Sequence, residues 1–295
     1  MIKQLAVIGV GLIGGSLALA LKKAGQVEQV VGYSRSAEAR EEALHLGIID
    51  SAADNIADAV KNADVVFVAV PMGAMQAVFA ELAPHLKTGA IVTDGGSAKQ
   101  QVIDGAKVTL GEHLTNFVPG HPIAGTEKSG PSAAFAELYE AHRVVLTPTI
   151  ETAAEAVQTV QQMWQQAGAE VFVMDVLQHD IVLAATSHLP HVLAFNLVGM
   201  LAERDDCEEV LRYAAGGFRD FSRIASSDAV MWRDICLGNR DAILELLRQY
   251  RSGLDKIEAA IREDNGAYLI DIFGRAKKAR DSRFAEPGLT DNSEV

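Results

Sequence analysis

Short, continuously apolar runs rich in β-branched residues recur through the first half of the chain. The strand candidates are Leu5–Ile8, Gln29–Tyr33, Val65–Val70, Ala90–Thr93, Asn116–Val118 and Val144–Leu146, with Val171–Met174 as a late addition. Stretches of helical length lie between them, namely Ile13–Ala24, Ala37–Leu46, Met75–Leu86, Ala98–Ala106 and Thr152–Gly168. This alternation predicts a mostly parallel sheet covered by helices. The runs are apolar throughout, which is typical of strands buried on both faces.

The strand pattern stops after Met174, and the rest of the chain has a helical pattern. The expected helices are Leu177–Arg204, Cys207–Tyr213, Ala229–Leu237, Arg240–Glu263 and Ala267–Arg280. We therefore predict an α/β domain over residues 1–174 and an all-helical domain over residues 175–280, joined without a linker. The polar stretch 281–295 is predicted to be a disordered tail, since it holds Pro287 and Gly288 and no apolar periodicity.

Two apolar segments resemble membrane signals. The run that ends at Leu21 has the composition of a signal peptide, but Leu5–Ile8 followed by regularly placed glycines favours a buried strand and a turn. The run from Ile181 to Leu201 has the length of a membrane span. It also contains two histidines, which are costly in lipid. We favour a helix buried in a core or in a subunit interface, and a protein with no membrane contact.

Composition narrows the class of protein. The 295 residues are 49% apolar and 22% charged, as in soluble globular proteins. The formal net charge of −13 and the lack of a Lys/Arg block exclude a nucleic-acid binder, although local groups can still hold small anions. Cys207 and Cys236 are too few and too far apart for a disulfide framework or a cysteine-based metal site. Sparse cysteine fits a cytoplasmic protein.

A glycine-rich turn follows the first strand. Gly9, Gly11 and Gly14 form the pattern G-x-G-x-x-G, with Leu12 and Ile13 opening the first helix. In this context the glycines allow a tight turn, close approach of a pyrophosphate and close packing of helix on strand. The free N–H groups at the helix start then favour phosphate. The alternative is a glycine turn that binds nothing. We predict a dinucleotide site.

The end of the second strand bears on the choice of cofactor. Ser34 and Arg35 stand where NAD-preferring sites usually place an acidic residue for the ribose 2′-OH. A hydroxyl and a guanidinium suit a 2′-phosphate, so we predict NADP, with NAD as an alternative. Val70 and Pro71 end a later strand and are expected to wall the adenosine and ribose side.

Polar residues follow two later strands. Ser97 lies in the stretch from Asp94 to Lys99, and His121 begins a stretch that continues through Thr126 and Glu127 to Gly130. Ligands of open α/β folds bind at the carboxyl edge of the sheet, where both stretches are expected. A histidine there is well placed as a general base. The other histidines of this half have no comparable polar residues around them in sequence and are expected at the surface; they are His45, His85, His113 and His142. His179, in the second half, is expected to be structural.

At this point the sequence resembles one family. The matching stretches are Gly9–Gly14, Ser97, His121–Glu127, Ser187–His191, Gly216–Ala225, Ser227–Asp228 and Met231–Asp234, in that order. The chain resembles the prephenate/arogenate dehydrogenases of tyrosine biosynthesis, also called cyclohexadienyl dehydrogenases, over roughly residues 1 to 280. The His-Pro-x-Ala-Gly-Thr and Ser-His-Leu-Pro-His stretches are specific, whereas the glycine motif is shared by many dehydrogenases.

The resemblance implies a Rossmann-type N-terminal domain and an all-α dimerisation domain like the C-terminal domain of 6-phosphogluconate dehydrogenase. It implies oxidative decarboxylation of prephenate to 4-hydroxyphenylpyruvate, or of arogenate to tyrosine, by a homodimer. By the match, His121 is the catalytic base and Ser97 holds it or the substrate in register. The implied substrate-binding residues are Arg223, His191, Thr126, Glu127 and Trp232. Arg223 and Trp232 could act in the same subunit or in its partner.

Two other functions are compatible with part of this pattern. One is a different reductase of similar architecture, such as a β-hydroxyacid dehydrogenase or a pyrroline-carboxylate reductase. Those families usually use a lysine or other groups on the first long helix of the second domain, where this chain has Ser187, His188 and His191. The other is a non-enzymatic sensor of NADP, which would need neither His121 nor Arg223.

Overall fold

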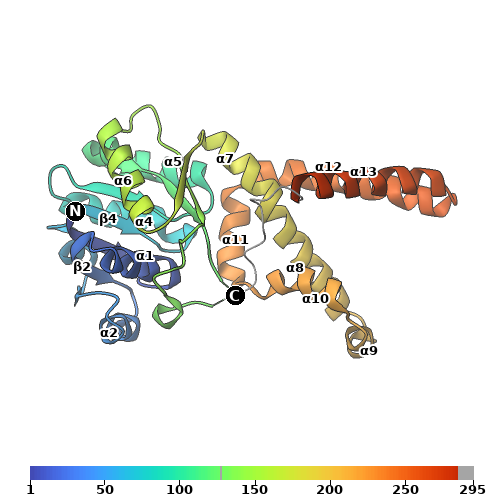
Figure 1. The fold of residues 1–295 in the computed structure, drawn as a ribbon, viewed down its shortest axis with the longest axis horizontal. Coiled ribbons are helices and arrows are strands. Elements are labelled where there is room, and N and C mark those ends of the chain that lie inside the picture. The colour runs from blue at the N-terminus through green and yellow to red at the C-terminus, as the bar shows by residue number, and fades with distance from the viewer. Residues whose placement is uncertain (127, 285–295) are drawn as a thin grey trace. The chain divides into compact units, whose positions relative to one another are not determined.

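A parallel sheet at the N-terminal end organises the protein in the computed structural model, which describes residues 1–126 and 128–284 (Figure 1). The chain forms two compact units, Met1–Ile243 and Leu244–Val295. All the described strands belong to the first unit.

The main sheet has six parallel strands in the order β3-β2-β1-β4-β5-β6. They are β1 (Ile2–Ile8), β2 (Val27–Tyr33), β3 (Ser51–Ala52), β4 (Val65–Val68), β5 (Ile91–Asp94) and β6 (Phe117–Val118). The order reverses between β1 and β4, which is the switch point where doubly wound sheets bind dinucleotides. The predicted Rossmann-type α/β fold is confirmed.

Helices connect these strands, except α6, which comes after them in the chain and packs against β6. They are α1 (Leu12–Lys23), α2 (Ala37–His45), α3 (Ile56–Val60), α4 (Met75–Leu82), α5 (Lys99–Thr109) and α6 (Ala154–Gln166), with short 3₁₀ turns at Met72–Ala74, Ala83–His85, Gly111–Asn116 and Pro131–Ala133. Ser36 caps α2 by accepting a hydrogen bond from the Ala39 N–H, and Asn55 caps α3 in the same way. The five-residue α3 was not predicted, because it is too short to show helical periodicity.

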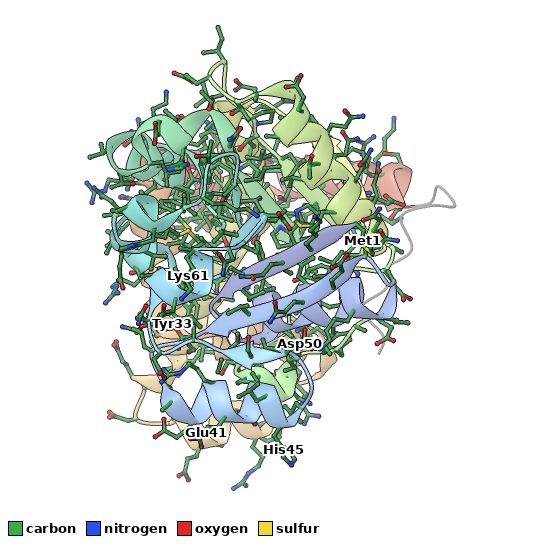
Figure 2. The ribbon with its side chains drawn as sticks, turned by 90° about the vertical axis from the view of Figure 1, so that its left-hand side faces the viewer. Met1, Tyr33, Glu41, His45, Asp50 and Lys61 are labelled. Carbon is green, nitrogen blue, oxygen red and sulfur yellow. The ribbon has the colours of Figure 1, made fainter. Side chains whose placement is uncertain are left out.

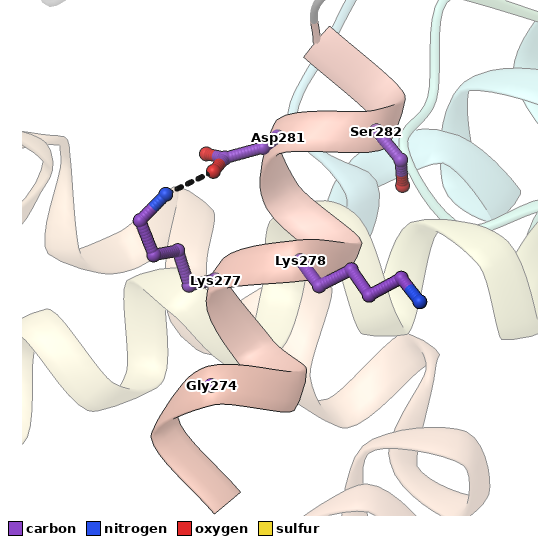
Figure 3. Close-up of a pocket in the computed structure, with 5 residues that line it drawn as sticks. All are labelled: Gly274, Lys277, Lys278, Asp281 and Ser282. Atoms are coloured by element: carbon purple, nitrogen blue, oxygen red, sulfur yellow. Dashed lines mark hydrogen bonds and ion pairs between the residues drawn. The ribbon is translucent and has the colours of Figure 1, made fainter. Parts of the chain in front are cut away.

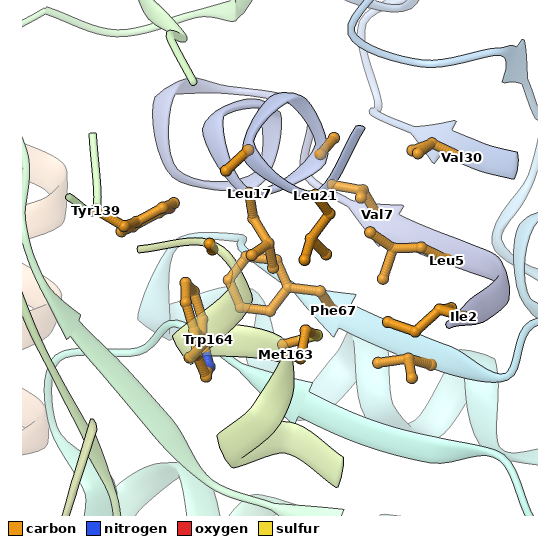
Figure 4. Packing of buried hydrophobic residues seen from close by; sticks show 14 of the residues in the cluster. Ile2, Leu5, Val7, Leu17, Leu21, Val30, Phe67, Tyr139, Met163 and Trp164 are labelled. Atoms are coloured by element: carbon orange, nitrogen blue, oxygen red, sulfur yellow. The ribbon is translucent and has the colours of Figure 1, made fainter. Parts of the chain in front are cut away.

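The strands of the main sheet are buried on both faces. In β1, Leu5 and Val7 belong to one hydrophobic cluster, while Ala6 and Ile8 belong to the cluster on the opposite face. Figure 4 shows the first cluster, in which the ring of Phe67 meets Trp164 edge-on at 5.4 Å between centroids. This double burial explains why the strands read as unbroken apolar runs.

A second sheet holds three strands, β7 (Gly120–Ile123), β8 (Arg143–Leu146) and β9 (Glu170–Val173), with β7 antiparallel to β8. His121 follows β6 in the chain, as expected, but it lies inside β7, opposite Val145, and this strand was not predicted. Gly120 and Pro122 flank His121, so β7 carries no apolar signal in the sequence. Proline is tolerated here because β7 is an edge strand.

A helical stretch follows β9. It comprises α7 (Val176–Leu183), a π-helical turn (Ala184–His188), α8 (Leu189–Ala202), α9 (Cys207–Arg212), α10 (Gly216–Arg223), a 3₁₀ turn (Ile224–Ser226) and α11 (Ala229–Gly238). The predicted helix Leu177–Arg204 is thus interrupted by the π turn just before Pro190, which has no N–H to donate. Helix α10 was not predicted, because it begins with Gly216 and Gly217, which are poor helix formers.

The helix pair α12 (Arg240–Arg262) and α13 (Gly266–Phe284) completes the described chain. Asp264, with φ of 51°, makes the turn between them. Helix α13 runs through residues 281–284, so the start of the predicted disordered tail is helical. Residues 285–295 lie outside the described part of the chain.

The helical run Val176–Ala202 is long and apolar enough to cross a membrane by length and composition, and 22% of its most apolar window is buried. Leu177, Ile181 and Met200 are exposed on it. Its inward face carries His179, Asp180 and His188, all of which are buried against the rest of the first unit. Buried polar groups held by protein partners are expected of a folded soluble domain.

Candidate active site

The glycine turn after β1 has the shape that a pyrophosphate site needs. Gly9 has φ of +102°, and a Cβ on it would lie 2.3 Å from the Ala69 carbonyl oxygen. A Cβ on Gly14 would lie 2.1 Å from the Gly9 oxygen. Gly11 caps α1 and faces open space, with no acidic residue in the first turn of the helix. The residues present therefore fit a dinucleotide phosphate at the α1 N-terminus.

The end of β2 lies beside this turn, since the Gly9 N–H donates to the Tyr33 oxygen over 2.8 Å. Ser34 is half-buried and Arg35 is exposed. Sequence reasoning missed Arg40, whose Nη1 donates to the Ser34 oxygen at 2.6 Å and whose guanidinium lies 5.9 Å from the Tyr33 ring centroid. Figure 2 shows this side of the sheet, with Tyr33 at the opposite end of the strands from Met1.

Two details of the cofactor region were not anticipated. Glu38 brings a carboxylate to the loop after β2, where it accepts a hydrogen bond from Ser36 at 2.6 Å. At the end of β4, Val70 is half-buried and Pro71 is exposed. Val70 contacts the glycine turn, because its side chain would lie 3.3 Å from a Cβ on Gly9. The predicted cofactor residues thus come from the carboxyl ends of β1, β2 and β4.

A buried ion pair joins β5 to β7. The Lys99 Nζ lies 2.5 Å from the Asp94 Oδ2 and donates to the Gly120 oxygen at 2.6 Å. The Gly120 N–H returns a hydrogen bond to the Asp94 Oδ1 at 3.1 Å. Burial lowers the Lys99 pKa, which the Asp94 charge partly opposes. These bonds fix the backbone immediately before His121.

His121 is buried, with 8% of its surface exposed. Its pKa lies well below the usual value, chiefly because burial disfavours the imidazolium, and the nearby Lys99 charge acts in the same direction. His121 is therefore neutral near pH 7 and has a ring nitrogen able to accept a proton. Ser97, the predicted partner, is half-buried at the start of α5, and the described residues show no hydrogen bond between its hydroxyl and His121.

The hydrogen-bond partner of His121 is another histidine, His179. The His179 Nε2 lies 2.9 Å from the His121 Nδ1, and the His179 Nδ1 lies 2.8 Å from the Asp180 Oδ1. Asp180 also accepts the N–H groups of Lys99 and Gln100, at 2.8 and 3.0 Å. The sequence offered no local signal for this cluster, because 58 residues separate His179 from His121.

An aromatic and imidazole wall forms the helical side of the site. The His191 ring is stacked on Trp232, with centroids 3.7 Å apart and planes inclined by 19°. His188 meets the same indole edge-on at 6.1 Å. The His191 Nδ1 donates to the Ser187 oxygen at 2.9 Å, which leaves its Nε2 as an acceptor in the neutral ring. The indole N–H of Trp232 is buried and has no hydrogen-bond partner among residues 1–126 and 128–284.

The Arg223 guanidinium places positive charge near the stacked rings of His191 and Trp232. The His191 pKa is lowered by burial and, more weakly, by the Arg223 charge, while the bond to Ser187 acts to raise it. Arg223 at the end of α10 is therefore near enough to His191 for its charge to act on that ring. His188, which sequence reasoning did not single out, is held by Asn239 at 3.1 Å. Burial lowers the pKa of His188 to about 4.

Thr126 and Glu127 were also predicted to bind the substrate, and no described contact joins Thr126 to this cluster. Thr126 is exposed, and its hydroxyl accepts the Lys128 N–H at 3.2 Å. Glu127 lies outside the described residues.

Figure 3 shows a separate hollow on α13, lined by Gly274, Lys277, Lys278, Asp281 and Ser282. Lys277 pairs there with Asp281. The residues come from a single helix, so the hollow does not bring together side chains from separate elements.

The fold and these groups define a dehydrogenase with a nucleotide-binding sheet and a helical second part. The model of the family "Prephenate dehydrogenase, nucleotide-binding domain" matches residues 17–173, and that of "Prephenate dehydrogenase, dimerization domain" matches residues 175–275. The chain belongs to the prephenate dehydrogenase family.

Individual relatives agree with this assignment. The chain is 42% identical to cyclohexadienyl dehydrogenase of Zymomonas mobilis over 280 residues, which is 94% of this chain and 95% of the relative. Prephenate dehydrogenase of Aquifex aeolicus, solved with hydroxyphenyl propionate and NAD⁺, superposes with a TM-score of 0.89 at 34% identity, covering 96% and 98% of the two chains. Arogenate dehydrogenase of Synechocystis gives a TM-score of 0.79 at 29% identity, covering 95% and 99%.

Proposed function

We propose that the protein catalyses oxidative decarboxylation of prephenate, of arogenate or of both in tyrosine biosynthesis, with a nicotinamide dinucleotide as hydride acceptor. The observation that carries this proposal is His121, a buried and neutral imidazole in the same unit as the glycine turn. Membership of the family and the solved complex of the Aquifex relative support it over the β-hydroxyacid dehydrogenase and pyrroline-carboxylate reductase alternatives.

Within this reaction His121 acts on the 4-hydroxyl of the substrate ring. The nicotinamide, when bound, supplies a hydride acceptor for the carbon that bears this hydroxyl. His121 accepts the hydroxyl proton, so the O–H bond breaks and an N–H bond forms. General-base assistance of this kind contributes typically about 10² to 10⁴-fold. Loss of CO₂ from the ring then gives an aromatic product, which makes the overall reaction effectively irreversible. Ser97 is proposed to contact the hydroxyl.

The substrate carries carboxylates, which a chain with net charge −13 must hold with local groups. Arg223 beside His191 supplies a guanidinium that can bind a carboxylate through two parallel hydrogen bonds. Trp232 is proposed to wall the ring, since its indole is already stacked on His191. Thr126 and Glu127 remain proposed contacts from the segment after β7, and Glu127 would suit the side-chain amine of arogenate.

We infer a preference for NADP over NAD. The support is the pair Ser34 and Arg35 at the end of β2, together with Arg40, which holds the Ser34 carbonyl in place. The Glu38 carboxylate lies in the same loop and would disfavour a 2′-phosphate. That carboxylate accepts a hydrogen bond from Ser36. The pyrophosphate would be held by the glycine turn and the start of α1, namely Gly9, Gly11, Leu12, Ile13 and Gly14. Val70 and Pro71 would lie along the adenosine ribose.

We further propose a homodimer formed through the helical part, as the description of the matching family model suggests. The exposed apolar side chains of α7 and α8, including Ile181 and Met200, support such an interface. The alternation of exposed apolar and buried polar positions on this run fits a protein partner better than lipid. Cys207 and Cys236 are both free, which accords with a cytoplasmic protein.

The test is a matrix of two substrates and two cofactors, with reduction of the nicotinamide followed by its absorbance. Prephenate and arogenate are each combined with NAD and with NADP, and 4-hydroxyphenylpyruvate or tyrosine is identified as product. We expect turnover in at least one combination, with a higher kcat/KM for NADP. Absence of turnover in all four would overturn the proposed reaction, and a higher kcat/KM for NAD would overturn only the cofactor preference.

A further inference from the structure

Three buried side chains are connected in series behind the proposed base. The His121 Nδ1 lies 2.9 Å from the His179 Nε2, with ring centroids 5.1 Å apart and planes inclined by 64°. The His179 Nδ1 lies 2.8 Å from the Asp180 Oδ1. His179 is fully buried and Asp180 nearly so. Both ring nitrogens of His179 are therefore used within the protein.

Asp180 is the fixed end of this series. Burial acts to raise the Asp180 pKa, but hydrogen bonds from His179 and from the N–H groups of Lys99 and Gln100 outweigh it and leave that pKa below its usual value. The carboxylate is therefore ionised near neutral pH and only accepts hydrogen bonds. Asn239 Nδ2 also donates to the Asp180 backbone oxygen at 2.7 Å, so the residue is held from several sides.

The ionised carboxylate determines where the protons of both rings lie. Because the Asp180 Oδ1 only accepts, the His179 Nδ1 carries a proton, which leaves the lone pair of that ring on Nε2. That lone pair in turn requires the His121 Nδ1 to be the donor. The lone pair of His121 is consequently on Nε2, the nitrogen that does not face His179.

From this geometry we infer that His179 is the positioning residue of the proposed base. His179, anchored by Asp180, holds His121 in the tautomer whose Nε2 is free and supports the imidazolium that forms when His121 takes a proton. The inference rests on the proposed function for the identity of the proton donor. In the step, the substrate O–H bond breaks, the His121 Nε2–H bond forms, and His121 keeps its Nδ1 proton.

The surrounding charges show why such support is needed. Burial of the ring opposes a positive charge on His121, and the nearby Lys99 ammonium opposes it as well. Asp94 is engaged by Lys99, Gly96 and Gly120, so its charge is already matched. Asp180 is the carboxylate linked to His121 through hydrogen bonds, and His179 is the link. This arrangement parallels the orienting role of the acid in a Ser-His-Asp triad.

The kinetic test compares three substitutions made in the full-length chain. His179→Phe removes the acceptor, and we expect kcat to fall roughly a hundredfold while KM for the substrate changes less than about threefold. His179→Gln keeps an oxygen that can accept from His121 and should restore kcat to within about tenfold of wild type. His85→Gln, at an exposed position, is the matched control and should behave as wild type. Equal kcat for His179→Phe and wild type would overturn the inference.

A second readout needs no turnover. Nitrogen-15 NMR of ring-labelled histidine at pH 7 should show His121 protonated on Nδ1 and bare on Nε2. It should show a mixture of tautomers in His179→Phe. A wild-type His121 protonated on Nε2 would overturn the inference even in an active enzyme. If the predicted tautomer is present but neither prephenate nor arogenate is turned over, the proposed function fails while the tautomer assignment stands.

Discussion

The Lys99 ammonium and the Asp94 carboxylate meet at 2.5 Å with neither side chain exposed to solvent. The pair crosses from the start of α5 to the end of β5 and binds both backbone groups of Gly120. It therefore ties the main sheet to β7 one residue before His121. A buried ion pair is weak evidence for added stability, but removal of one partner leaves an uncompensated charge.

We predict that Lys99→Met strongly destabilises the fold. Loss of one partner of a buried pair costs about 3–5 kcal/mol, because the remaining Asp94 charge keeps only the Gly96 and Gly120 N–H groups. Urea unfolding measures the change. Lys107→Met, which removes an exposed lysine 3.5 Å from Glu151, is the control and should cost less than about 1 kcal/mol. If Lys99→Met and Lys107→Met lowered the free energy of unfolding equally, the buried pair would contribute no more to stability than an exposed one.

Acid should destabilise the protein partly through His188. Its pKa is lowered by burial from 6.5 to about 4, so the unfolded state binds the proton first. The stability contribution is complete above pH 6.5 and is lost as the pH falls from there toward 4. The full loss amounts to about 3 kcal/mol, from roughly 1.4 kcal/mol per pKa unit.

The check on His188 is the pH dependence of the free energy of unfolding. In His188→Gln the dependence between pH 6.5 and 4 should be shallower than in wild type, whatever the stability at neutral pH. His45→Gln, at an exposed histidine, is the control and should give the same curve as wild type. If His188→Gln and wild type gave parallel curves, His188 would not be the group that titrates.

Ser34→Asp should shift the cofactor preference from NADP toward NAD. A carboxylate at this position repels a 2′-phosphate and accepts a hydrogen bond from a 2′-hydroxyl. We expect the ratio of kcat/KM for NADP to that for NAD to fall at least about tenfold, roughly 1.4 kcal/mol. Lys61→Gln, which removes an exposed lysine at the end of α3, is the control. An unchanged ratio in Ser34→Asp would contradict the assignment of Ser34 and Arg35 to the 2′-phosphate.

The sequence predicted the features that depend on local pattern. The parallel strands were predicted because burial on both faces gives unbroken apolar runs such as Val65–Val70, and the glycine turn because three spaced glycines follow such a run. The helical second part was predicted from periodicity, although Gly216 and Gly217 concealed α10. Strand β7 was missed, because Gly120 and Pro122 give it no apolar signal.

The connections within the site depend on tertiary packing and could not be predicted in the same way. His179 was expected to be structural, since nothing near it in sequence indicates that its ring meets His121. The role of Lys99 was missed because burial of a lysine is not visible in a pattern. His191, Trp232 and Arg223 were named as substrate-binding residues only through the family resemblance, which did not indicate that the His191 ring stacks on the indole.

The most direct test of the proposed function is the turnover of His121→Asn. With prephenate or arogenate saturating and the preferred cofactor present, kcat should fall at least about a hundredfold, because the general base is lost. Cofactor affinity, measured in the same preparation by fluorescence titration, should stay within about threefold, because His121 is not part of the glycine turn. A kcat close to that of wild type would contradict the assignment of His121 as the base.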